Sequence, residues 1–450
     1  MSKTVPFLKK HPLTQGISWM KDPVNYMETA FKDYPDLFVT DGIGEGGPVV
    51  FVHHPEAVQQ ILTGDRQNLI APGKPHLLRP VIGSNSMIGL NGNDHKKRRK
   101  LLMPAFHGER MHAYGHLVYN LTSQTFERLN SGEVFTGMTM CKEISLQVIL
   151  EAIYGLGDSE RSQKLRPLIA KIANVFHSPI NVIFLFFPWL QQDLGAWSPW
   201  GRFLRLRNST DQAIYEEIEA RRSAPDVTRQ DILSLLMTIK DEAGNSLTLP
   251  ELRDELMGLT IAGYETTAIA MSWALYWIHH LPRVKRKLLA EIDSLGESPD
   301  PMEIANLPYL DAVCKETLRI YPVGILTLPR VVQEPTEVLE YKLEPGQVAA
   351  GCIYLLHQRE DIYPNPKEFR PERFLEREFS PFEFIAFGGG LRRCMGQALA
   401  QFEIKLVIAT ILMNYDLDLA DHRPEVLTRK GVRLGPSRGV QMIFKGKRNK

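Results

Sequence analysis

A run of three glycines, followed closely by a cysteine and a helical stretch, constrains the fold of this 450-residue chain more than any other feature. The segment reads Phe387-Gly-Gly-Gly-Leu-Arg-Arg-Cys394-Met-Gly396. Glycine allows the backbone to adopt positive φ and to approach a flat ligand closely. Cys394 precedes a helix, whose positive dipole end, together with Arg392 and Arg393, favours thiolate over thiol. The segment therefore predicts a bed for a flat ligand with one thiolate beside it.

Five spaced positions of this segment resemble the haem-binding loop of the cytochrome P450 family, Phe-x-x-Gly-x-Arg-x-Cys-x-Gly. They are Phe387, Gly390, Arg392, Cys394 and Gly396. The resemblance implies haem b (iron protoporphyrin IX) held in this loop, with Cys394 as the ligand to its iron. One thiolate leaves the opposite face of the iron open to dioxygen, and its electron donation favours O–O cleavage. The alternative is a glycine turn before a core helix, with Cys394 as an inert buried thiol.

A long segment between two helix-boundary signals predicts the main helix of the fold. Thr248-Leu-Pro-Glu251 is a capping box with proline in the first turn, and the next proline is Pro282. A helix between them would be roughly 50 Å long at 1.5 Å per residue. Inside it, Ala262-Gly-Tyr-Glu-Thr-Thr267 combines a glycine, an acid and two hydroxyls, which are poor choices for a helix interior.

This internal segment resembles the family's oxygen-activation segment, Ala/Gly-Gly-x-Asp/Glu-Thr-Thr/Ser. Thr266 can turn its hydroxyl toward a backbone carbonyl and loosen the helix, opening a notch beside Ala262 for dioxygen and water. The resemblance implies that Thr266 stabilises activated dioxygen and that Glu265 helps to relay protons. The alternative is that these polar side chains only face solvent.

The basic run His95-Lys-Lys-Arg-Arg-Lys100 is typical of a nucleic-acid patch. Lysine and arginine number 53 against 52 acids, so net charge implies no polyanionic partner, and we expect no nucleic acid. The family's propionate-binding helix usually carries Trp-x-x-x-Arg, and here His95-x-x-x-Arg99 takes that place with an N–H donor retained. The resemblance implies that Arg99 and Arg392 pair with the haem propionates. Arg330 is a further candidate.

The other basic residues of the run allow two interpretations. They are either a solvated face or a docking surface for an acidic redox protein. These residues are Lys96, Lys97, Arg98 and Lys100.

Glu316-Thr-Leu-Arg319 has the spacing of a helical surface salt bridge. The family pairs this element with the segment Pro371-Glu-Arg-Phe374 downstream. The resemblance therefore implies a buried network of Glu316, Arg319 and Arg373 that supports folding and haem retention.

His112 and His116 have the i,i+4 spacing of two metal ligands on one helical face. No partner acid or third ligand is evident from the sequence. A plain amphipathic helix explains the pair better.

The rest of the chain completes a mainly α prediction. Residues 1–92 mix helices with strands such as Leu37–Thr40 and Val49–Val52, residues 93–322 are helical in pattern, and residues 323–450 carry the haem loop. The loop between the two strands matches G-x-G-x-x-G, but a strand follows it, so we predict a hairpin and reject dinucleotide binding. We predict one domain over residues 1–450 with the cytochrome P450 fold, combining a large helical region with a small sheet-bearing region.

Cysteine usage and hydropathy point to the cytoplasm. The four cysteines are far apart, which suits a reducing compartment. The N-terminus lacks the apolar core of a signal peptide. The longest apolar run, Val182–Leu190, has nine residues, whereas a membrane span needs about 20. We expect a cytoplasmic monomer without a membrane span.

The expected pocket walls are apolar: Val81–Ile88, Val323–Leu328 and part of Phe184–Leu190. Apolar walls with few polar groups predict a hydrophobic ligand. The longer aromatic stretch Phe184–Phe203 is either core or a lid. Pro188, Gly195 and Pro199 interrupt it, which favours the lid.

The resemblance implies a haem-thiolate monooxygenase that uses dioxygen. No flavin or iron–sulfur domain fits in this length, so electrons would come from a separate ferredoxin and ferredoxin reductase. We favour a long-chain fatty acid as substrate, with Lys74 and Arg79 as candidate anchors, over a terpenoid. A haem-thiolate isomerase, dehydratase or peroxide-driven enzyme is a competing hypothesis with the same fold, and a haem-based sensor or carrier is a third.

Overall fold

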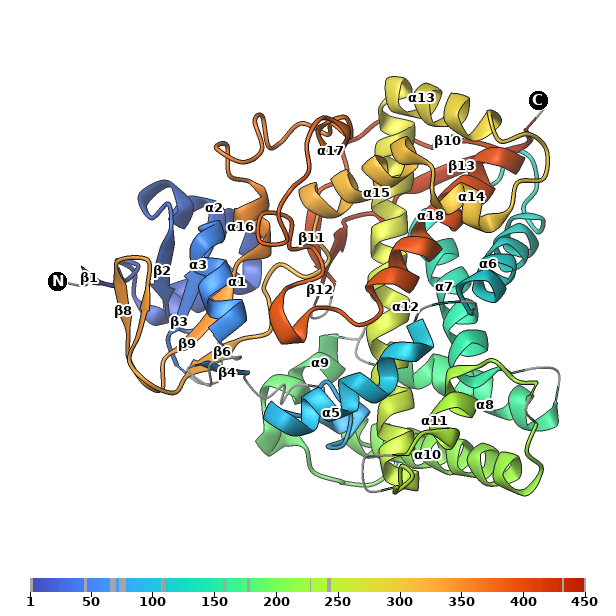
Figure 1. The fold of residues 1–450 in the computed structure, drawn as a ribbon, viewed down its shortest axis with the longest axis horizontal. Coiled ribbons are helices and arrows are strands. Elements are labelled where there is room, and N and C mark those ends of the chain that lie inside the picture. The colour runs from blue at the N-terminus through green and yellow to red at the C-terminus, as the bar shows by residue number, and fades with distance from the viewer. Residues whose placement is uncertain are drawn as a thin grey trace.

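Helices form the larger part of the molecule, and the main sheet lies at one end of it together with the N-terminus (Figure 1). The computed structural model describes residues 3–43, 47–64, 70–72, 78–106, 108, 110–156, 159–175, 179–226, 228–240, 244–430 and 433–448. The mainly α prediction with small sheets is confirmed. Among the described residues, no helix is both long enough and apolar enough to cross a membrane.

The helix α12 (Leu249–His280) runs through the centre of the helical part (Figure 1). It begins as predicted, because the Thr248 side chain accepts from the Glu251 amide and the Glu251 carboxylate accepts from the Thr248 amide at 2.9 Å. It ends where Pro282 starts α13 (Pro282–Asp293). Most of its residues are buried, since α7 (Gly137–Tyr154) and α18 (Gln397–Asn414) pack against it.

Proline opens many of the other helices, where its missing N–H costs no hydrogen bond. One of them, α15 (Pro308–Ile320), carries Glu316 and Arg319. The remaining α-helices are α1 (Pro12–Lys21), α2 (Pro23–Asp33), α3 (Pro55–Thr63), α4 (Arg79–Ile82), α5 (Gly92–Leu102), α6 (Arg110–Phe126), α8 (Glu160–Asn174), α9 (Pro179–Phe186), α10 (Pro199–Ser223), α11 (Ile232–Thr238), α14 (Pro301–Ala305), α16 (Ile353–His357) and α17 (Arg373–Glu376).

The largest sheet joins strands from the N-terminal region to strands that follow α15. Its strand order is β2 (Leu37–Thr40), β3 (Val49–Val52), β9 (Val348–Gly351), β6 (Arg330–Val332) and β4 (Ile70–Pro72). The strands β2 and β3 pair antiparallel, which confirms the predicted hairpin, although residues 44–46 of its loop lie outside the described part. The strands β3 and β9 pair parallel, so this sheet draws on both the first hundred residues and the segment after α15.

Three smaller sheets complete the β structure. Their strands are β1 (Lys3–Thr4), β8 (Tyr341–Leu343) and β7 (Thr336–Val338); β10 (Tyr415–Leu419), β13 (Gln441–Lys447) and β5 (Val134–Thr136); and β11 (Leu427–Lys430) with β12 (Arg433–Pro436). The strand β12 contacts α12, which brings the C-terminal region close to the segment 262–267.

The aromatic stretch Phe184–Phe203 is divided between core and surface. Trp200 and Phe203, in the first turns of α10, are buried. Trp189 and Trp197, in the connection between α9 and α10, are 70% and 75% exposed. None of the described side chains of this stretch lines the central cavity, and the side chains at positions 186 and 188 lie outside the described part, so a contribution of Phe184–Leu190 to its wall stays a prediction.

Candidate functional site

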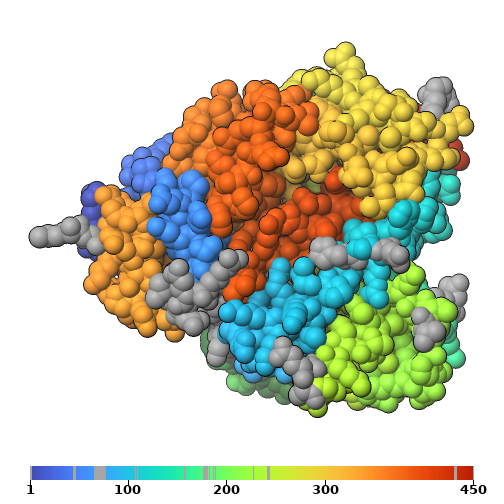
Figure 2. All heavy atoms as spheres, viewed as in Figure 1, coloured from blue at the N-terminus to red at the C-terminus, as the bar shows by residue number. Residues whose placement is uncertain are grey.

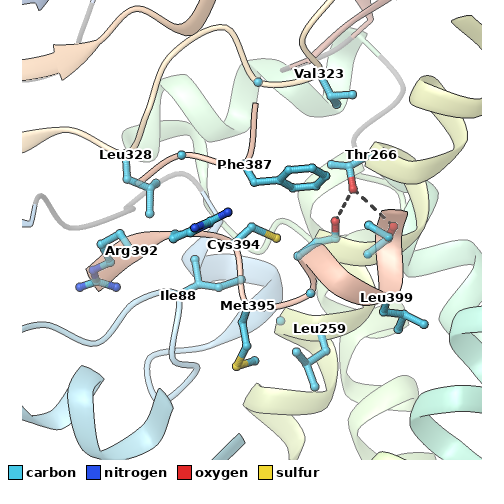
Figure 3. A pocket seen from close by; sticks show the side chains of 18 of the residues that line it. Ile88, Leu259, Thr266, Val323, Leu328, Phe387, Arg392, Cys394, Met395 and Leu399 are labelled. Carbon is cyan, nitrogen blue, oxygen red and sulfur yellow. Dashed lines mark hydrogen bonds between the residues drawn. The ribbon is translucent and has the colours of Figure 1, made fainter. Parts of the chain in front are cut away.

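A cavity of about 450 Å³ lies between α12 and the cysteine loop before α18. Figure 3 shows Cys394 and Thr266 on its wall, each supplied by one of these two elements. Of the predicted wall segment 81–88, Ser86 to Ile88 line the cavity, whereas the predicted segment 323–328 lines it along its whole length except at Ile325. Val81 and Ile82 belong instead to the hydrophobic core. The cavity walls are thus largely apolar, as the sequence predicted.

The glycine run lies directly against the end of α3. Gly388 and Gly390 have positive φ, at 69° and 64°, where an L side chain would be strained. A Cβ atom on Gly390 would stand 1.9 Å from the carbonyl oxygen of Leu62. The close backbone approach predicted from these glycines is therefore a contact between Gly390 and the backbone of Leu62. Leu62 itself lines the cavity, and nothing in its local sequence marks it.

The loop then turns Cys394 toward the cavity. The Cys394 amide donates to the carbonyl oxygen of Phe387 at 2.9 Å, which closes the loop. The Cys394 residue is solvent-accessible from the cavity, yet surrounding protein raises the pKa of its thiol, and the Gly396 amide, Arg99 and Arg393 only partly offset this. The helix end and Arg393 therefore favour thiolate as predicted, but burial opposes them with a larger effect on the pKa.

Three arginines from distant parts of the chain converge around His95. Burial, together with the charges of Arg392, Arg99 and Arg330, lowers the pKa of His95 to about 4. All four side chains line the cavity. Each arginine also donates to a backbone carbonyl oxygen, which fixes its direction: Arg99 to Arg393 at 2.7 Å, Arg330 to Leu328 at 2.7 Å, and Arg392 to Met87 at 3.3 Å. The fold therefore brings together the four residues that the sequence predicted near the haem propionates, His95, Arg99, Arg330 and Arg392.

Thr266 lies on the cavity wall within α12, which is continuous from Leu249 to His280 (Figure 3). Its hydroxyl donates to the carbonyl oxygen of Ala262 at 2.7 Å, and the Thr267 hydroxyl donates to Gly263 at 2.8 Å. A Cβ atom on Gly263 would lie 2.7 Å from the Ile149 side chain, so glycine allows α7 to pack closely here. The predicted hydrogen bond from the Thr266 hydroxyl to a backbone carbonyl oxygen is therefore confirmed.

Glu265 is buried and takes part in ion pairs with two cations. Lys142 of α7 lies 3.1 Å from its carboxylate, and Arg433 of β12 pairs with the other oxygen. Arg433 also donates to the carbonyl oxygen of Ile261 at 3.0 Å. Glu265 is not part of the described cavity wall, so its carboxylate lies behind the wall that Thr266 forms.

Arg98 contradicts both interpretations of the basic run, because it is buried. Its guanidinium pairs with Glu255 at 2.8 Å and with Glu251 at 2.6 Å, both in the first turns of α12. Glu255 also accepts from the Met87 amide at 2.8 Å, so this network fixes a loop that lines the cavity. Burial raises the pKa of Glu255 to about 7, although Arg98 opposes the shift. Arg98 follows His95 by three residues, so both lie on the buried face of α5. This helical spacing could have indicated that Arg98 is buried, although its neighbours in the sequence are basic.

The buried network around Glu316 is present as the resemblance implied. Glu316 accepts two bonds from Arg319, at 2.6 and 2.8 Å, and one from Arg373 at 3.1 Å. The side chains of Glu316 and Arg319 have 0% exposure, and that of Arg373 has 2%. Arg319 also donates to the carbonyl oxygen of His357, which ties α15 to α16.

Sequence reasoning missed one acid in this region, Glu403 of α18. It is 1% exposed and lines the cavity. Burial raises its pKa to about 8, although the neighbouring Ser145 opposes the shift. A lone acid in the apolar stretch after the cysteine was a signal that could have identified it.

Comparisons with known proteins place this site in a family. A family model for cytochrome P450 matches residues 5–442. Cytochrome P450 135B1 of Mycobacterium tuberculosis is 30% identical over 436 residues, covering 97% of this chain and 90% of that protein. Cytochrome P450 138 of the same organism is 30% identical over 441 residues, covering 98% and 96%. The chain belongs to the cytochrome P450 family, and it is a haem-dependent monooxygenase.

Solved structures show the same fold. Cyanobacterial CYP120A1 with retinoic acid bound aligns with a TM-score of 0.84 at 22% identity, covering 99% of this chain and 100% of that chain. The haem domain of cytochrome P450DA aligns with a TM-score of 0.85 at 22% identity, covering 100% and 99%. At this level of identity the likeness establishes the architecture.

The residues present fit haem b. One thiol faces the cavity from a glycine loop, three arginines converge where two carboxylates would lie, and apolar side chains form the remaining walls. Thiolate, guanidinium and apolar contacts are the groups that iron, propionates and a macrocycle require.

Proposed function

We propose that Cys394 is the proximal ligand of the haem iron and that the enzyme hydroxylates a hydrophobic substrate, a long-chain fatty acid by preference. The observation that carries this proposal is one cavity with Cys394 on the cysteine loop, Thr266 on α12 and apolar walls around them. When bound, haem supplies the iron at which dioxygen is activated, with the thiolate favouring O–O cleavage.

Two groups of residues would hold the haem: the cysteine loop at the iron and the arginines at the propionates. Phe387 and Gly396 belong to the loop that presents Cys394. Arg99, Arg330 and Arg392 would pair with the propionates, since guanidinium groups bind carboxylates through charge-assisted hydrogen bonds. His95 lies among these arginines, and its low pKa, about 4, keeps the imidazole neutral, so it would add an N–H donor without further positive charge.

Thr266 and Glu265 would serve proton delivery. The Thr266 hydroxyl sits at the cavity wall and can exchange its bond to Ala262 for a bond to a reacting oxygen atom. Glu265 lies behind it, held by Lys142 and Arg433. The carboxylate would have to leave one of these ion pairs before it could accept or pass a proton toward the cavity.

The substrate class rests on the character of the cavity wall. Ile88, Leu259, Val323 and Leu326 are among its apolar members, and such walls bind apolar ligands with few orienting contacts. Of the two candidate anchors, Lys74 lies outside the described residues. Arg79 donates to Ser84 at 3.0 Å and is not part of the described cavity lining.

A terpenoid is the second candidate substrate. The CYP120A1 structure was solved with retinoic acid bound, an apolar isoprenoid chain that ends in a carboxylate. A binding titration that compares fatty acids, their methyl esters and retinoic acid by haem absorbance separates the two classes. Saturable shifts with fatty acids alone support our preference, and shifts with isoprenoids alone contradict it.

The proposed electron source is a separate ferredoxin with its reductase. Lys96, Lys97 and Lys100 are exposed on α5, and Arg393 is exposed beside Cys394, so positive charge is available to an acidic protein near the cysteine loop. We propose that the chain acts as one domain, as a monomer and in the cytoplasm.

A stoichiometry measurement tests the proposed chemistry. Thr266→Ala removes the hydroxyl at the cavity wall, so reductant should still be consumed while product falls and hydrogen peroxide rises. Loss of a positioned proton donor typically costs on the order of 10²–10⁴ in the step it serves. Ser272→Ala, further along α12, is the matched control and should keep the wild-type ratio of product to reductant. Its hydroxyl also donates to the carbonyl oxygen four residues earlier, but it is not among the described cavity-lining residues.

An unchanged ratio in Thr266→Ala would remove Thr266 from the oxygen chemistry. Product formation without oxygen consumption would favour an isomerase or dehydratase. Oxygen binding without turnover would favour a sensor or carrier.

A further inference from the structure

Two histidines of α6 and an aspartate before α14 form a cluster outside the described cavity lining. His112 and His116 lie one helical turn apart, with ring centroids separated by 6.1 Å. One ligand atom of each, together with a carboxylate oxygen of Asp300, lies within 4.8 Å of the others. The sequence left the histidine pair without an acid, and the fold supplies Asp300 from a distant segment.

The distances in the cluster approach those of a metal site. His112 Nε2 lies 3.7 Å from Asp300 Oδ1. Bonds of about 2.0–2.1 Å in a tetrahedral zinc site place neighbouring ligand atoms about 3.3 Å apart. The His112 side chain is 55% exposed, so it can rotate by the small amount that closes this difference.

The position of Asp300 is fixed by two independent contacts. Its carboxylate accepts from the Met302 amide at 2.7 Å, and its own amide donates to Glu303 at 3.0 Å, a reciprocal cap on α14. Gly115, between the two histidines, lies so close to Pro301 that a Cβ atom there would stand 2.6 Å from the proline side chain. The absent side chain at Gly115 therefore lets α14 approach α6 and holds Asp300 beside the histidines.

We infer that His112, His116 and Asp300 bind one divalent transition-metal ion, with Zn²⁺ as the best-matched ion. Two imidazoles and a carboxylate are ligands that zinc accepts, and three protein ligands leave one position for water. Calcium and magnesium prefer oxygen ligands and are disfavoured by the two nitrogens. A hydrogen-bonded carboxylate, as Asp300 is, is the usual arrangement around a metal.

The ion would join α6 to α14. Both helices pack against α18, the helix that follows Cys394. In Figure 2 the cyan atoms of α6 and the yellow atoms of α14 adjoin beside the red band of α18. Bound Zn²⁺ should therefore stabilise this side of the helical region against unfolding, by mass action on the folded state.

The test is a calorimetric titration of the untagged, haem-loaded enzyme with ZnCl₂ in a buffer that does not chelate metals. We expect one equivalent to bind and to raise the midpoint of thermal unfolding. His116→Ala and Asp300→Asn should each weaken binding by at least about tenfold. His422→Ala, which removes an exposed histidine elsewhere, should bind Zn²⁺ as the wild type does.

Gly115→Ala tests the geometry, because it keeps all three ligands but pushes against Pro301. It should weaken Zn²⁺ binding while the circular dichroism spectrum and haem content stay those of the wild type. Equal Zn²⁺ affinity in the wild type and His116→Ala, or loss of the bound equivalent in His422→Ala alone, would overturn the inference. Zinc binding does not depend on turnover, so these results are independent of the proposed substrate.

Discussion

Two glutamate–arginine pairs in this molecule have the same i,i+3 spacing and opposite surroundings. In α15, Arg319 binds Glu316 at 2.6 Å, and neither side chain is exposed. In α10, Arg222 binds Glu219 at 2.8 Å, with 41% and 54% of the side chains exposed. Spacing on a helix thus predicts that a pair will meet, whereas burial depends on what packs over it. Arg373 packs against Glu316, and it comes from a later segment that the sequence around Glu316 does not predict.

The largest expected effect is at the buried pair. Glu316→Gln leaves the charges of Arg319 and Arg373 buried without their carboxylate, so the free energy of unfolding should fall by roughly 3–5 kcal/mol. Urea unfolding of the purified enzyme, followed by tryptophan fluorescence, measures the change. A loss below about 1 kcal/mol would mean that the backbone carbonyl oxygens around these arginines are sufficient to stabilise them.

Arg98 should behave as a buried residue in a run of exposed ones. Arg98→Ala removes charged hydrogen bonds to Glu251 and Glu255, and such bonds contribute about 1.5–3 kcal/mol. Lys97→Ala, the exposed neighbour, should change the free energy of unfolding by less than about 0.5 kcal/mol. Similar losses in the two variants would contradict the inward placement of Arg98.

Glu403 is a buried acid without an arginine partner of this kind among the described residues, and its burial should make the stability of the folded protein depend on pH. Its pKa of about 8 in the folded protein lies above the ordinary value of a glutamate in the unfolded chain. Its contribution to stability is therefore complete below the ordinary pKa and is lost as pH rises toward 8. The loss approaches about 1.4 kcal/mol per pH unit within that window.

Glu403→Gln cannot ionise, so this pH-dependent loss should be absent from the variant. Thermal unfolding at pH 5 to 8 should show the midpoint of the variant rising relative to the wild type. The exposed Glu378→Gln serves as control and should follow the wild type. Parallel curves for Glu403→Gln and the wild type would contradict the burial of this acid.

The smallest effect is expected at the exposed pair. Glu219→Gln should lower the free energy of unfolding by only about 0.2–0.5 kcal/mol, because solvent-exposed i,i+3 pairs contribute little. High salt should reduce the difference further. A loss as large as that of Glu316→Gln would show that spacing, rather than burial, determines the strength of these pairs.

The same contrast explains which parts of the fold could be predicted. The helix from Thr248 to Pro282 carries its own boundary signals, and the observed α12 follows them. The strands β2 and β3 have short apolar runs with a glycine-rich turn between them, and both were predicted with the observed bounds. Local chemistry determines these elements, so local sequence was enough.

Other features depend on contacts between distant segments. Asp300 reaches His112 only because Gly115 lets α14 approach α6, and Arg433 reaches Glu265 from the C-terminal hairpin. The pKa of Cys394 depends on how tightly the protein surrounds the thiol, which a motif does not specify. Burial and pairing across the chain are properties of packing, and the sequence pattern carries no direct signal for them.

The role of Cys394 is the central claim, and the carbon-monoxide difference spectrum of the reduced, haem-loaded enzyme tests it most directly. Cys394→Ala removes the one thiol on the described cavity wall, so the absorbance typical of a ferrous haem-thiolate should disappear. Cys314→Ala, at a buried cysteine of α15, should retain that absorbance. A haem-thiolate spectrum that survives unchanged in Cys394→Ala would contradict the account.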